Sequence, residues 1–414
     1  METYDFRARS YNWRLYGGQD SIEKHLPSEI KRHNAKNVFI ISSKSIAQKT
    51  TLIQRVKSSI GEKYSGAYTE IEKDSTYSSV MEATTAAKEA NADLLVAIGG
   101  GSVLVAARAV NIFLCEGGNP FELMTQYPTG KPAYSPRLVK PKLPTINFPT
   151  TPTSAMNRAG TGLKNNDLDQ RMEYFDPKTR PVSLFFDREA LLSAPFELLR
   201  STATSTFSST LASLAVPAPN PLVEGDRLQA FSLTNESYLQ ISSPEMNEKN
   251  RYDLCTAAFL NNRAADDGPP SAQYGPRDPS KKNVNPFVGN YSISTVLHLF
   301  PGVGQGEATS VLTATVARKS AEESTLGSQT IAQLLGVWED GMTFQEATLK
   351  SADEIESRYI KVGMPTRIRE LPNISQKNFN QIAQQTLRNF NYDSGTRSDD
   401  EQLKASLELL EEAW

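Results

Sequence analysis

The stretch Leu94–Arg108 (LLVAIGGGSVLVAAR) constrains the fold of this chain more strongly than any other. A continuous apolar run ends there in three glycines, which is typical of a strand buried on both faces of a parallel sheet. Glycines let a ligand approach the backbone closely, and the N–H groups of a following helix attract an anion. The residues concerned are Gly99, Gly100, Gly101 and Ser102. Two interpretations stay open: a diphosphate cradle, or a tight strand-to-helix turn without a ligand.

Strand and helix patterns alternate through the first 187 residues. Apolar, β-branched runs predict strands at 38–41, 145–148 and 182–186, and helical patterns cover 47–61 and 75–92. This alternation predicts an α/β domain with a doubly wound, mainly parallel sheet of the dinucleotide-binding kind.

The chain changes character after Asp187. Helical patterns cover 189–214, 227–261 and 293–321, the last broken near Pro301. A final helix carries its apolar side chains on one face, namely Leu403, Leu407, Leu410 and Trp414. Because 414 residues are too many for one typical core, we predict two domains. They are an α/β domain at 1–187 and an all-helical domain at 188–414, with an exposed loop insertion at 262–286.

The composition is that of an ordinary soluble protein. The net charge is −3 and 22% of the residues are charged, so no basic excess favours nucleic acid or a membrane surface. No signal-peptide pattern or membrane-length apolar run is present in the sequence. The two isolated cysteines, Cys115 and Cys255, are expected to be small buried residues. We therefore expect a cytoplasmic protein that acts on a small molecule, and a homodimer stays open.

Several motifs together resemble the iron-containing alcohol dehydrogenase family, which shares its fold with maleylacetate reductases, glycerol dehydrogenases and dehydroquinate synthases. They are the Gly-Gly-Gly-Ser turn, Pro-Thr-Thr at 149–151 and the all-helical second half. Leu15–Gly18 resembles the family's early glycine turn, and Asp187–Pro195 resembles the segment that joins its two domains. The resemblance implies an active-site cleft between the two domains.

The resemblance also implies NAD or NADP as the coenzyme. It assigns the diphosphate to Gly99–Ser102 and places Thr150 and Thr151 beside the coenzyme. Where the family often has an acidic residue that holds the adenosine ribose, this chain has Ser43 followed by Lys44. A missing carboxylate and an added cation favour the extra phosphate of NADP, whereas the alternative is a solvated lysine on a loop.

Other positions depart from the family pattern. After Pro-Thr-Thr the family continues as Ala-Gly-Thr-Gly-Ser-Glu, whereas this chain has Pro152–Asn157. The family's Asp and Lys after the glycines align with Val105 and Arg108. In the metal-dependent members an Asp and three His hold the ion, and these positions align with Ser208, Ala212, Ser294 and Gln305. None of these four side chains is a strong ligand for iron or zinc, so the sequence predicts no catalytic metal.

Four residues are candidates for contact with the substrate. His298 aligns with a second, non-ligating histidine of the family and is a candidate proton donor; the alternative is a packing residue. Arg108 is a candidate for holding an anionic or enolic substrate, or else a surface residue in a salt bridge. By the same resemblance, Tyr291 and Asn157 face the substrate.

Three functions follow from these observations. The first is a metal-independent NAD(P)H-dependent reductase acting on a small or polyketide-like carbonyl compound, in specialised metabolism. The second is a redox-neutral lyase, isomerase or cyclase that keeps the fold without metal or hydride transfer. The third is a non-catalytic binding protein. The fold resemblance alone does not decide among them.

Overall fold

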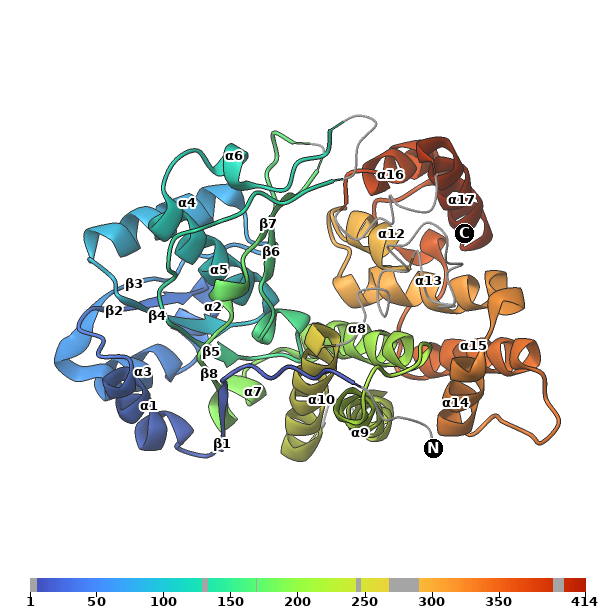
Figure 1. Ribbon diagram of the computed structural model, residues 1–414, viewed down its shortest axis with the longest axis horizontal. Coiled ribbons are helices and arrows are strands. Elements are labelled where there is room, and N and C mark those ends of the chain that lie inside the picture. The colour runs from blue at the N-terminus through green and yellow to red at the C-terminus, as the bar shows by residue number, and fades with distance from the viewer. Residues whose placement is uncertain (1–5, 129–132, 169, 243–246, 268–289, 390–397) are drawn as a thin grey trace. The chain divides into compact units, whose positions relative to one another are not determined.

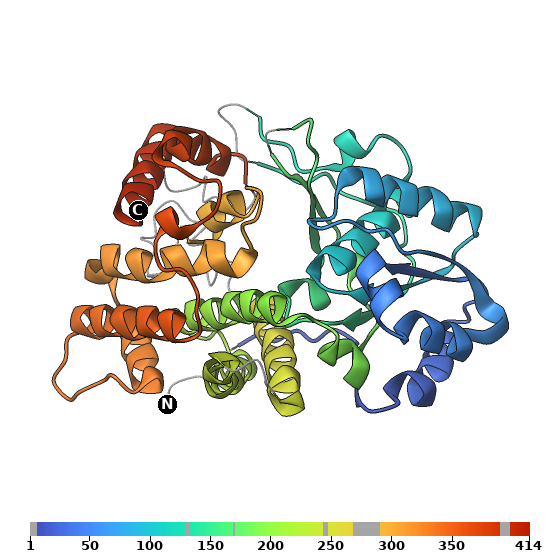
Figure 2. The same cartoon turned by 180° about the vertical axis from the view of Figure 1, so that it is seen from behind.

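The computed structural model describes residues 6–128, 133–168, 170–242, 247–267, 290–389 and 398–414 (Figures 1 and 2). The chain divides into two compact units, and each is described here by itself. The α/β unit consists of residues 11–195 together with 247–255. The helical unit consists of residues 1–10, 196–246 and 256–414. The division therefore follows Pro195, eight residues beyond the boundary expected from the sequence, and α7 (Arg188–Leu192) stays with the sheet.

A six-stranded sheet forms the centre of the α/β unit, and all its neighbouring strands run parallel. Its strand order is β1-β8-β5-β4-β2-β3. The strands are β1 (Arg14–Gly18), β2 (Val38–Ser42), β3 (Tyr64–Tyr68), β4 (Leu94–Gly99), β5 (Thr145–Pro149) and β8 (Ser183–Asp187). Every residue of β2, β4, β5 and β8 is buried, which explains the continuous apolar character of β2 and β4 up to their last residues. The predicted fold class is confirmed.

Helices cover both faces of this sheet. They are α1 (Ser21–Arg32), α2 (Lys44–Lys49), α3 (Leu52–Ile60), α4 (Tyr77–Glu89), α5 (Gly101–Glu116) and the short α6 (Pro120–Leu123). Figure 1 shows α1 and α3 on one side of the sheet and α4 and α5 on the other. On the first side, apolar residues of α1 and α3 such as Leu26 and Val56 pack against Ile40, Val96 and Ile146 of the strands.

The strand order places a topological switch point between β2 and β4. From β2 the chain moves outward to β3, and it then returns to the other side of β2 as β4. The connections therefore change direction between β2 and β4. In open α/β sheets ligands bind outside the carboxyl ends of the strands at such a switch point. Gly99, at the end of β4, and Ser43, directly after β2, both lie at this edge.

The helical unit has its core among its later helices. Its elements are α8 (Phe196–Leu214), α9 (Pro221–Tyr238), the greater part of α10 (Glu248–Asp267), α12 (Asn290–Leu297), α13 (Gln305–Lys319), α14 (Leu326–Leu335), α15 (Phe344–Lys361), α16 (Phe379–Thr386) and α17 (Asp399–Glu412). The apolar face predicted for the last helix packs into a cluster with α12, α13 and α16. The predicted break near Pro301 is confirmed, because α12 ends at Leu297 and α13 begins at Gln305.

Some elements differ from the sequence-based expectation. Strand β3 was not predicted, and neither was the antiparallel pair β6 (Gly160–Leu163) and β7 (Met172–Phe175). Residues 262–267 of the expected loop insertion belong to α10, and the remainder of that segment lies outside the described residues. Among the helices that the structure describes, none is both long enough and apolar enough to cross a membrane.

Candidate functional site

The glycine-rich turn joins β4 to α5 at the switch point. Gly100 is the N-cap residue of α5, and no side chain caps the helix there. A Cβ on Gly99 would stand 2.6 Å from Val103 Cγ2, so a side chain at Gly99 would collide with the first turn of the helix. At Gly101 a Cβ would stand 3.0 Å from Thr153 Oγ1. The glycines therefore bring the backbone close to its surroundings, and the first-turn N–H groups of α5 are not covered by a capping side chain.

Two threonines border this helix end. Thr150 and Thr151 follow β5 directly and are buried, and the Thr150 N–H donates to the carbonyl of Gly99 at 3.1 Å. Their hydroxyl oxygens lie 3.7 and 3.6 Å from the position of a Cβ on Gly100. The Thr151 hydroxyl is buried without a hydrogen-bond partner among the described residues. A buried hydroxyl left without a partner is costly, so this atom is suited to a polar ligand at the end of α5.

Ser102 has a structural contact in the same turn. Its Oγ accepts a hydrogen bond from the Asp74 N–H at 3.0 Å, and its carbonyl accepts one from the Ser75 hydroxyl at 2.7 Å. The side chain of Ser102 thus holds the loop before α4 against α5. A role of Ser102 in binding an anion would therefore fall to its backbone N–H.

Ser43 and Lys44 follow the end of β2, next to the Gly99–Ser102 turn at the end of the neighbouring β4. The Ser42 hydroxyl donates to the Ile98 carbonyl at 2.7 Å, which ties β2 to β4 just before both strands end. Ser43 is half-buried and shares a hydrogen bond with Ser45 over 3.1 Å. Lys44 is exposed and begins α2. The ammonium group of Lys44 therefore lies at the switch point and is exposed to solvent.

Arg108 does not lie on the surface, and its alternative interpretation as an exposed salt-bridged residue is wrong. Its side chain is 2% exposed, and its Nη1 donates to the carbonyls of Ala155 at 2.6 Å and Arg158 at 2.7 Å. Burial, together with the charges of Arg158 and Arg180, lowers the pKa of Arg108 to about 9. Arg108 therefore holds the segment after β5 in place through two backbone carbonyl groups.

The other catalytic candidates are placed differently. Asn157 is completely buried, directly after the short 3-10 turn Ser154–Met156. His298 is half-buried in the turn after α12, with its Nδ1 3.0 Å from the carbonyl oxygen of Val303. Because a carbonyl only accepts, this contact places the proton of a neutral His298 on Nδ1. Tyr291 belongs to α12, but its side chain lies outside the described residues.

The positions aligned with metal ligands hold weak ligands in the structure. Ser208 is buried in the helical unit, where its hydroxyl shares hydrogen bonds with Thr313 and Tyr359. Ser294 is buried on α12, whereas Ala212 and Gln305 are half-buried. Hydroxyl, methyl and amide groups do not fit a divalent iron or zinc ion. Among the described residues no group of three or more His, Cys, Asp or Glu could hold a metal, and the absence of a metal stays a prediction.

The half-buried face of α8 carries a different set of residues from the one aligned above. It consists of Thr202, Ser205, Ser209 and Ala212. Ser205 and Ser209 have the four-residue spacing of the family's Asp-x-x-x-His, and both are serines. A shift of the alignment by three residues therefore leads to the same donor chemistry.

The sequence did not reveal the contact that caps the N-terminus of α13. The Gly306 N–H donates to the Ser201 hydroxyl at 3.0 Å, and that hydroxyl donates to Glu307 Oε2 at 2.5 Å. Ser201 belongs to α8, so it serves as a cap from a neighbouring helix where the N-cap residue Gly304 has no side chain. This contact fixes Gln305 and Gly306, which replace the family's His-Gly.

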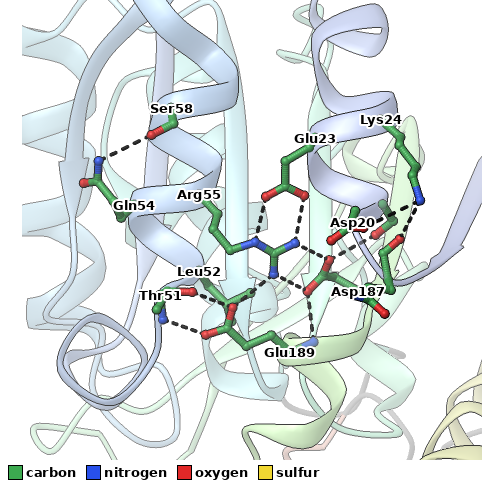
Figure 3. A network of polar contacts seen from close by, with 12 residues as sticks. Asp20, Glu23, Lys24, Thr51, Leu52, Gln54, Arg55, Ser58, Asp187 and Glu189 are labelled. Carbon is green, nitrogen blue, oxygen red and sulfur yellow. Dashed lines mark hydrogen bonds and ion pairs between the residues drawn. The ribbon is translucent and has the colours of Figure 1, made fainter.

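A second missed feature is the network around Arg55 (Figure 3). Its guanidinium donates to both oxygens of Asp187, at 2.9 and 3.0 Å, and to both oxygens of Glu23, at 2.7 and 2.8 Å. It also donates to Glu189 at 3.0 Å. The hydrogen bond from Arg55 lowers the pKa of Glu23. Asp187, the last residue of β8, is fully buried, so the network joins α1, α3 and α7 at the end of that strand.

The sequence of this chain is similar to a known family and to several characterised proteins. Residues 14–188 match the family described as iron-containing alcohol dehydrogenase. Alcohol dehydrogenase 4 of Saccharomyces cerevisiae is 25% identical over 247 residues, which are 59% of this chain and 62% of that protein. Maleylacetate reductase 2 of Cupriavidus pinatubonensis is 25% identical over 218 residues, 53% of this chain and 52% of that protein. The chain thus matches between half and two thirds of the length of these relatives.

Solved structures match over the whole chain. An alcohol dehydrogenase from Oenococcus oeni covers 100% of both chains with a TM-score of 0.80 at 18% identity. An NADH-dependent butanol dehydrogenase A from Thermotoga maritima covers 98% of this chain and 99% of its own, with a TM-score of 0.80 at 15% identity. At such identities these structures establish the fold. Residues 14–188 thus match the iron-containing alcohol dehydrogenase family, and the whole chain shares the fold of these solved structures.

Proposed function

We propose that this chain is an NAD(P)H-dependent oxidoreductase that reduces a carbonyl compound without a metal ion. The observation that carries the proposal is the helix end at the switch point. There the N-terminus of α5, which no side chain caps, lies beside the buried hydroxyl of Thr151, for which the described residues provide no hydrogen-bond partner. Backbone N–H groups and a hydroxyl are the donors that a diphosphate needs. The oxidoreductase names of the relatives support the same class of reaction.

The preference for NADP rests on Lys44. In this proposal the exposed ammonium group at the end of β2 attracts the additional phosphate on the adenosine ribose. The neighbouring Ser43 provides a hydroxyl and no negative charge, so nothing at this position repels that phosphate. NADPH is therefore the expected coenzyme, with NADH as the weaker one.

In the proposed reaction the coenzyme supplies the hydride when bound. His298 supplies the proton: its Nδ1–H is held by the Val303 carbonyl, so the proton leaves from Nε2 of the imidazolium. Tyr291 and Asn157 are proposed as further contacts to the substrate. Because hydroxyl, methyl and amide groups occupy the aligned metal positions, hydrogen-bond donors polarise the substrate carbonyl in place of a Lewis acid.

A coenzyme titration tests the cradle. NADPH fluorescence should change on binding to the wild type, whereas Gly101→Val should abolish binding, because the new side chain would occupy the space beside Thr153. Gly160→Ala is the matched control in the same unit: its Cβ would meet only Phe175, at 3.9 Å. A wild type that binds neither NADPH nor NADH would refute the proposal and favour the redox-neutral alternative.

The choice of coenzyme is tested with Lys44→Ala. We expect the Kd for NADPH to rise about 10-fold, equivalent to about 1.4 kcal/mol, with little change for NADH. Lys49→Ala, at the other end of α2, removes the same charge and is expected to change neither Kd. Equal effects on both coenzymes would contradict the role of Lys44.

Turnover tests the absence of a metal. NADPH oxidation should be followed with a panel of 2-oxo acids and unsaturated ketones, before and after treatment with a chelator. We expect the rate to persist in the chelator and to gain nothing from added Fe²⁺ or Zn²⁺. Loss of activity on chelation with recovery on adding metal would overturn this part of the proposal.

A further inference from the structure

The segment that follows the threonines of the cradle is held by two buried side chains. This 154–158 turn comprises Ser154 to Arg158 and begins next to Thr153, whose Oγ1 borders Gly101 of α5. It therefore adjoins the helix end to which we assign the diphosphate. A ligand that extends from that helix end past Thr153 meets this turn next.

Three backbone carbonyl groups of the turn accept hydrogen bonds from the two buried side chains. Arg108 Nη1 donates to Ala155 O at 2.6 Å and to Arg158 O at 2.7 Å. Asn147 Nδ2, from the middle of β5, donates to Met156 O at 2.8 Å. Arg108 and Asn147 are 2% and 1% exposed, so water does not compete for these bonds. Thr153 adds a fourth constraint, because its Oγ1 accepts from the Ala155 N–H at 3.1 Å.

The charge of Arg108 is consistent with this use of its donors. Among the described residues no carboxylate forms an ion pair with Arg108, and the charges that act on it are those of Arg158 and Arg180. Backbone carbonyl oxygens are thus the groups that stabilise the buried guanidinium. Replacing Arg108 would remove the donor that the Ala155 and Arg158 carbonyls share.

We propose that Arg108 and Asn147 are positioning residues, which fix the 154–158 turn as a preformed wall for the part of the coenzyme beyond its adenosine diphosphate. This inference rests on the proposed function. It replaces the expectation that Arg108 binds the substrate itself: Arg108 acts through the turn. We call Arg108 and Asn147 together the brace. The adenosine end of the coenzyme, at β2 and the helix end of α5, lies out of reach of these two side chains.

Hydrogen exchange measured by mass spectrometry tests the brace without any ligand. In Arg108→Met and in Asn147→Ala, amide exchange in residues 155–159 should be faster than in the wild type. Arg108→Lys keeps a donor at the end of a flexible chain and should restore part of the protection. Asn111→Ala is the matched control on α5, since this buried side chain donates to Leu143 O and Thr145 Oγ1, at the start of β5 and away from the 154–158 turn. It should leave exchange in residues 155–159 unchanged.

Binding of whole and truncated coenzymes tests the consequence. Arg108→Met should raise the Kd for NADPH about 10- to 100-fold and leave that for adenosine 2′,5′-bisphosphate unchanged. Asn111→Ala should alter neither Kd. If Arg108→Met shows the same amide exchange in residues 155–159 and the same Kd for NADPH as the wild type, the positioning role is refuted.

Substrate kinetics separate positioning from direct contact. A positioning role predicts an equal loss of kcat/KM for 2-oxo acids and for neutral ketones, whereas a KM increase confined to the acids would overturn it. Failure of the proposed function is recognised separately, as a wild type without NADPH binding. In that case the exchange data still decide whether the brace exists.

Discussion

Gly306 offers the sharpest test of how the helical unit is packed. A Cβ at this position would stand 2.0 Å from Ser201 O and 2.6 Å from Ser201 C, both backbone atoms of α8. Ordinary carbon contacts need about 3.5 Å, so Gly306→Ala forces α8 and α13 apart by roughly 1.5 Å. That displacement also breaks the hydrogen bonds from Gly306 N–H to Ser201 and from Ser201 to Glu307.

The expected loss of stability follows from these terms. Overpacking costs about 1–3 kcal/mol and the two hydrogen bonds contribute about 1 kcal/mol each, while alanine regains up to about 1 kcal/mol of helix propensity. We therefore expect Gly306→Ala to lower the free energy of unfolding of the helical unit by about 3 kcal/mol. Ser201→Ala removes the hydrogen bonds without the collision and should lower it by about 1–2 kcal/mol.

Urea unfolding, followed by circular dichroism and by the fluorescence of Trp338 and Trp414 in the helical unit, measures these changes. Gly225→Ala is the control, because Gly225 is exposed within α9 and a Cβ there would meet nothing within 4 Å. It should raise stability by up to about 1 kcal/mol. Should Gly306→Ala unfold within 1 kcal/mol of the wild type, the close approach of α13 to Ser201 would be refuted.

Two further predictions concern the network of Figure 3. Arg55→Gln leaves the buried Asp187 without its cation, so it should lower the free energy of unfolding by about 3 kcal/mol in thermal or urea unfolding. The control is Arg188→Gln, which breaks only an exposed ion pair and should lower that free energy by under about 1 kcal/mol. The second prediction is the pH dependence of that loss. The pKa of Glu23 is lowered chiefly by Arg55; that of Glu189 is raised by burial but lowered overall by the hydrogen bonds it accepts. Their contribution is present above the ordinary glutamate pKa and disappears as pH falls through the lowered values, so the difference in stability between wild type and Arg55→Gln should shrink as the pH falls below the ordinary glutamate pKa.

The fold was predictable where burial leaves a continuous apolar pattern. β2 and β4 are buried at every position, and their sequences VFIIS and LLVAIG record this directly. The sequence of β3, YSGAY, contains no apolar run, because this edge strand is half-buried along its whole length. The strands β6 and β7 have only four residues each, too few for a pattern, and they pair across a connection of eight residues.

The Gly99–Ser102 turn and the contacts of Arg108 show what a sequence can and cannot reveal. Gly99–Ser102 could be located because a turn of this kind is local, and every residue that forms it is adjacent in the chain. Arg108 was expected to meet an anion or solvent, since a single sequence shows a cation and no partner. Its actual partners are main-chain carbonyls at Ala155 and Arg158, which have no sequence signature at all. Contacts to the backbone of a distant turn follow only from the tertiary structure.

The alignment of the metal positions on α8 illustrates a further limit, and it also shows which conclusion is independent of it. Nine of the nineteen residues of α8 are Ser or Thr, so polarity does not reveal which side of the helix faces inward. The structure turns Ser208 into the core, while Ser205 and Ser209 lie on the half-buried face. A ligand pair on either register would consist of hydroxyl or methyl groups, which do not hold a divalent ion. The proposal of a metal-independent reaction therefore depends on the composition of α8 and not on the alignment that first suggested it.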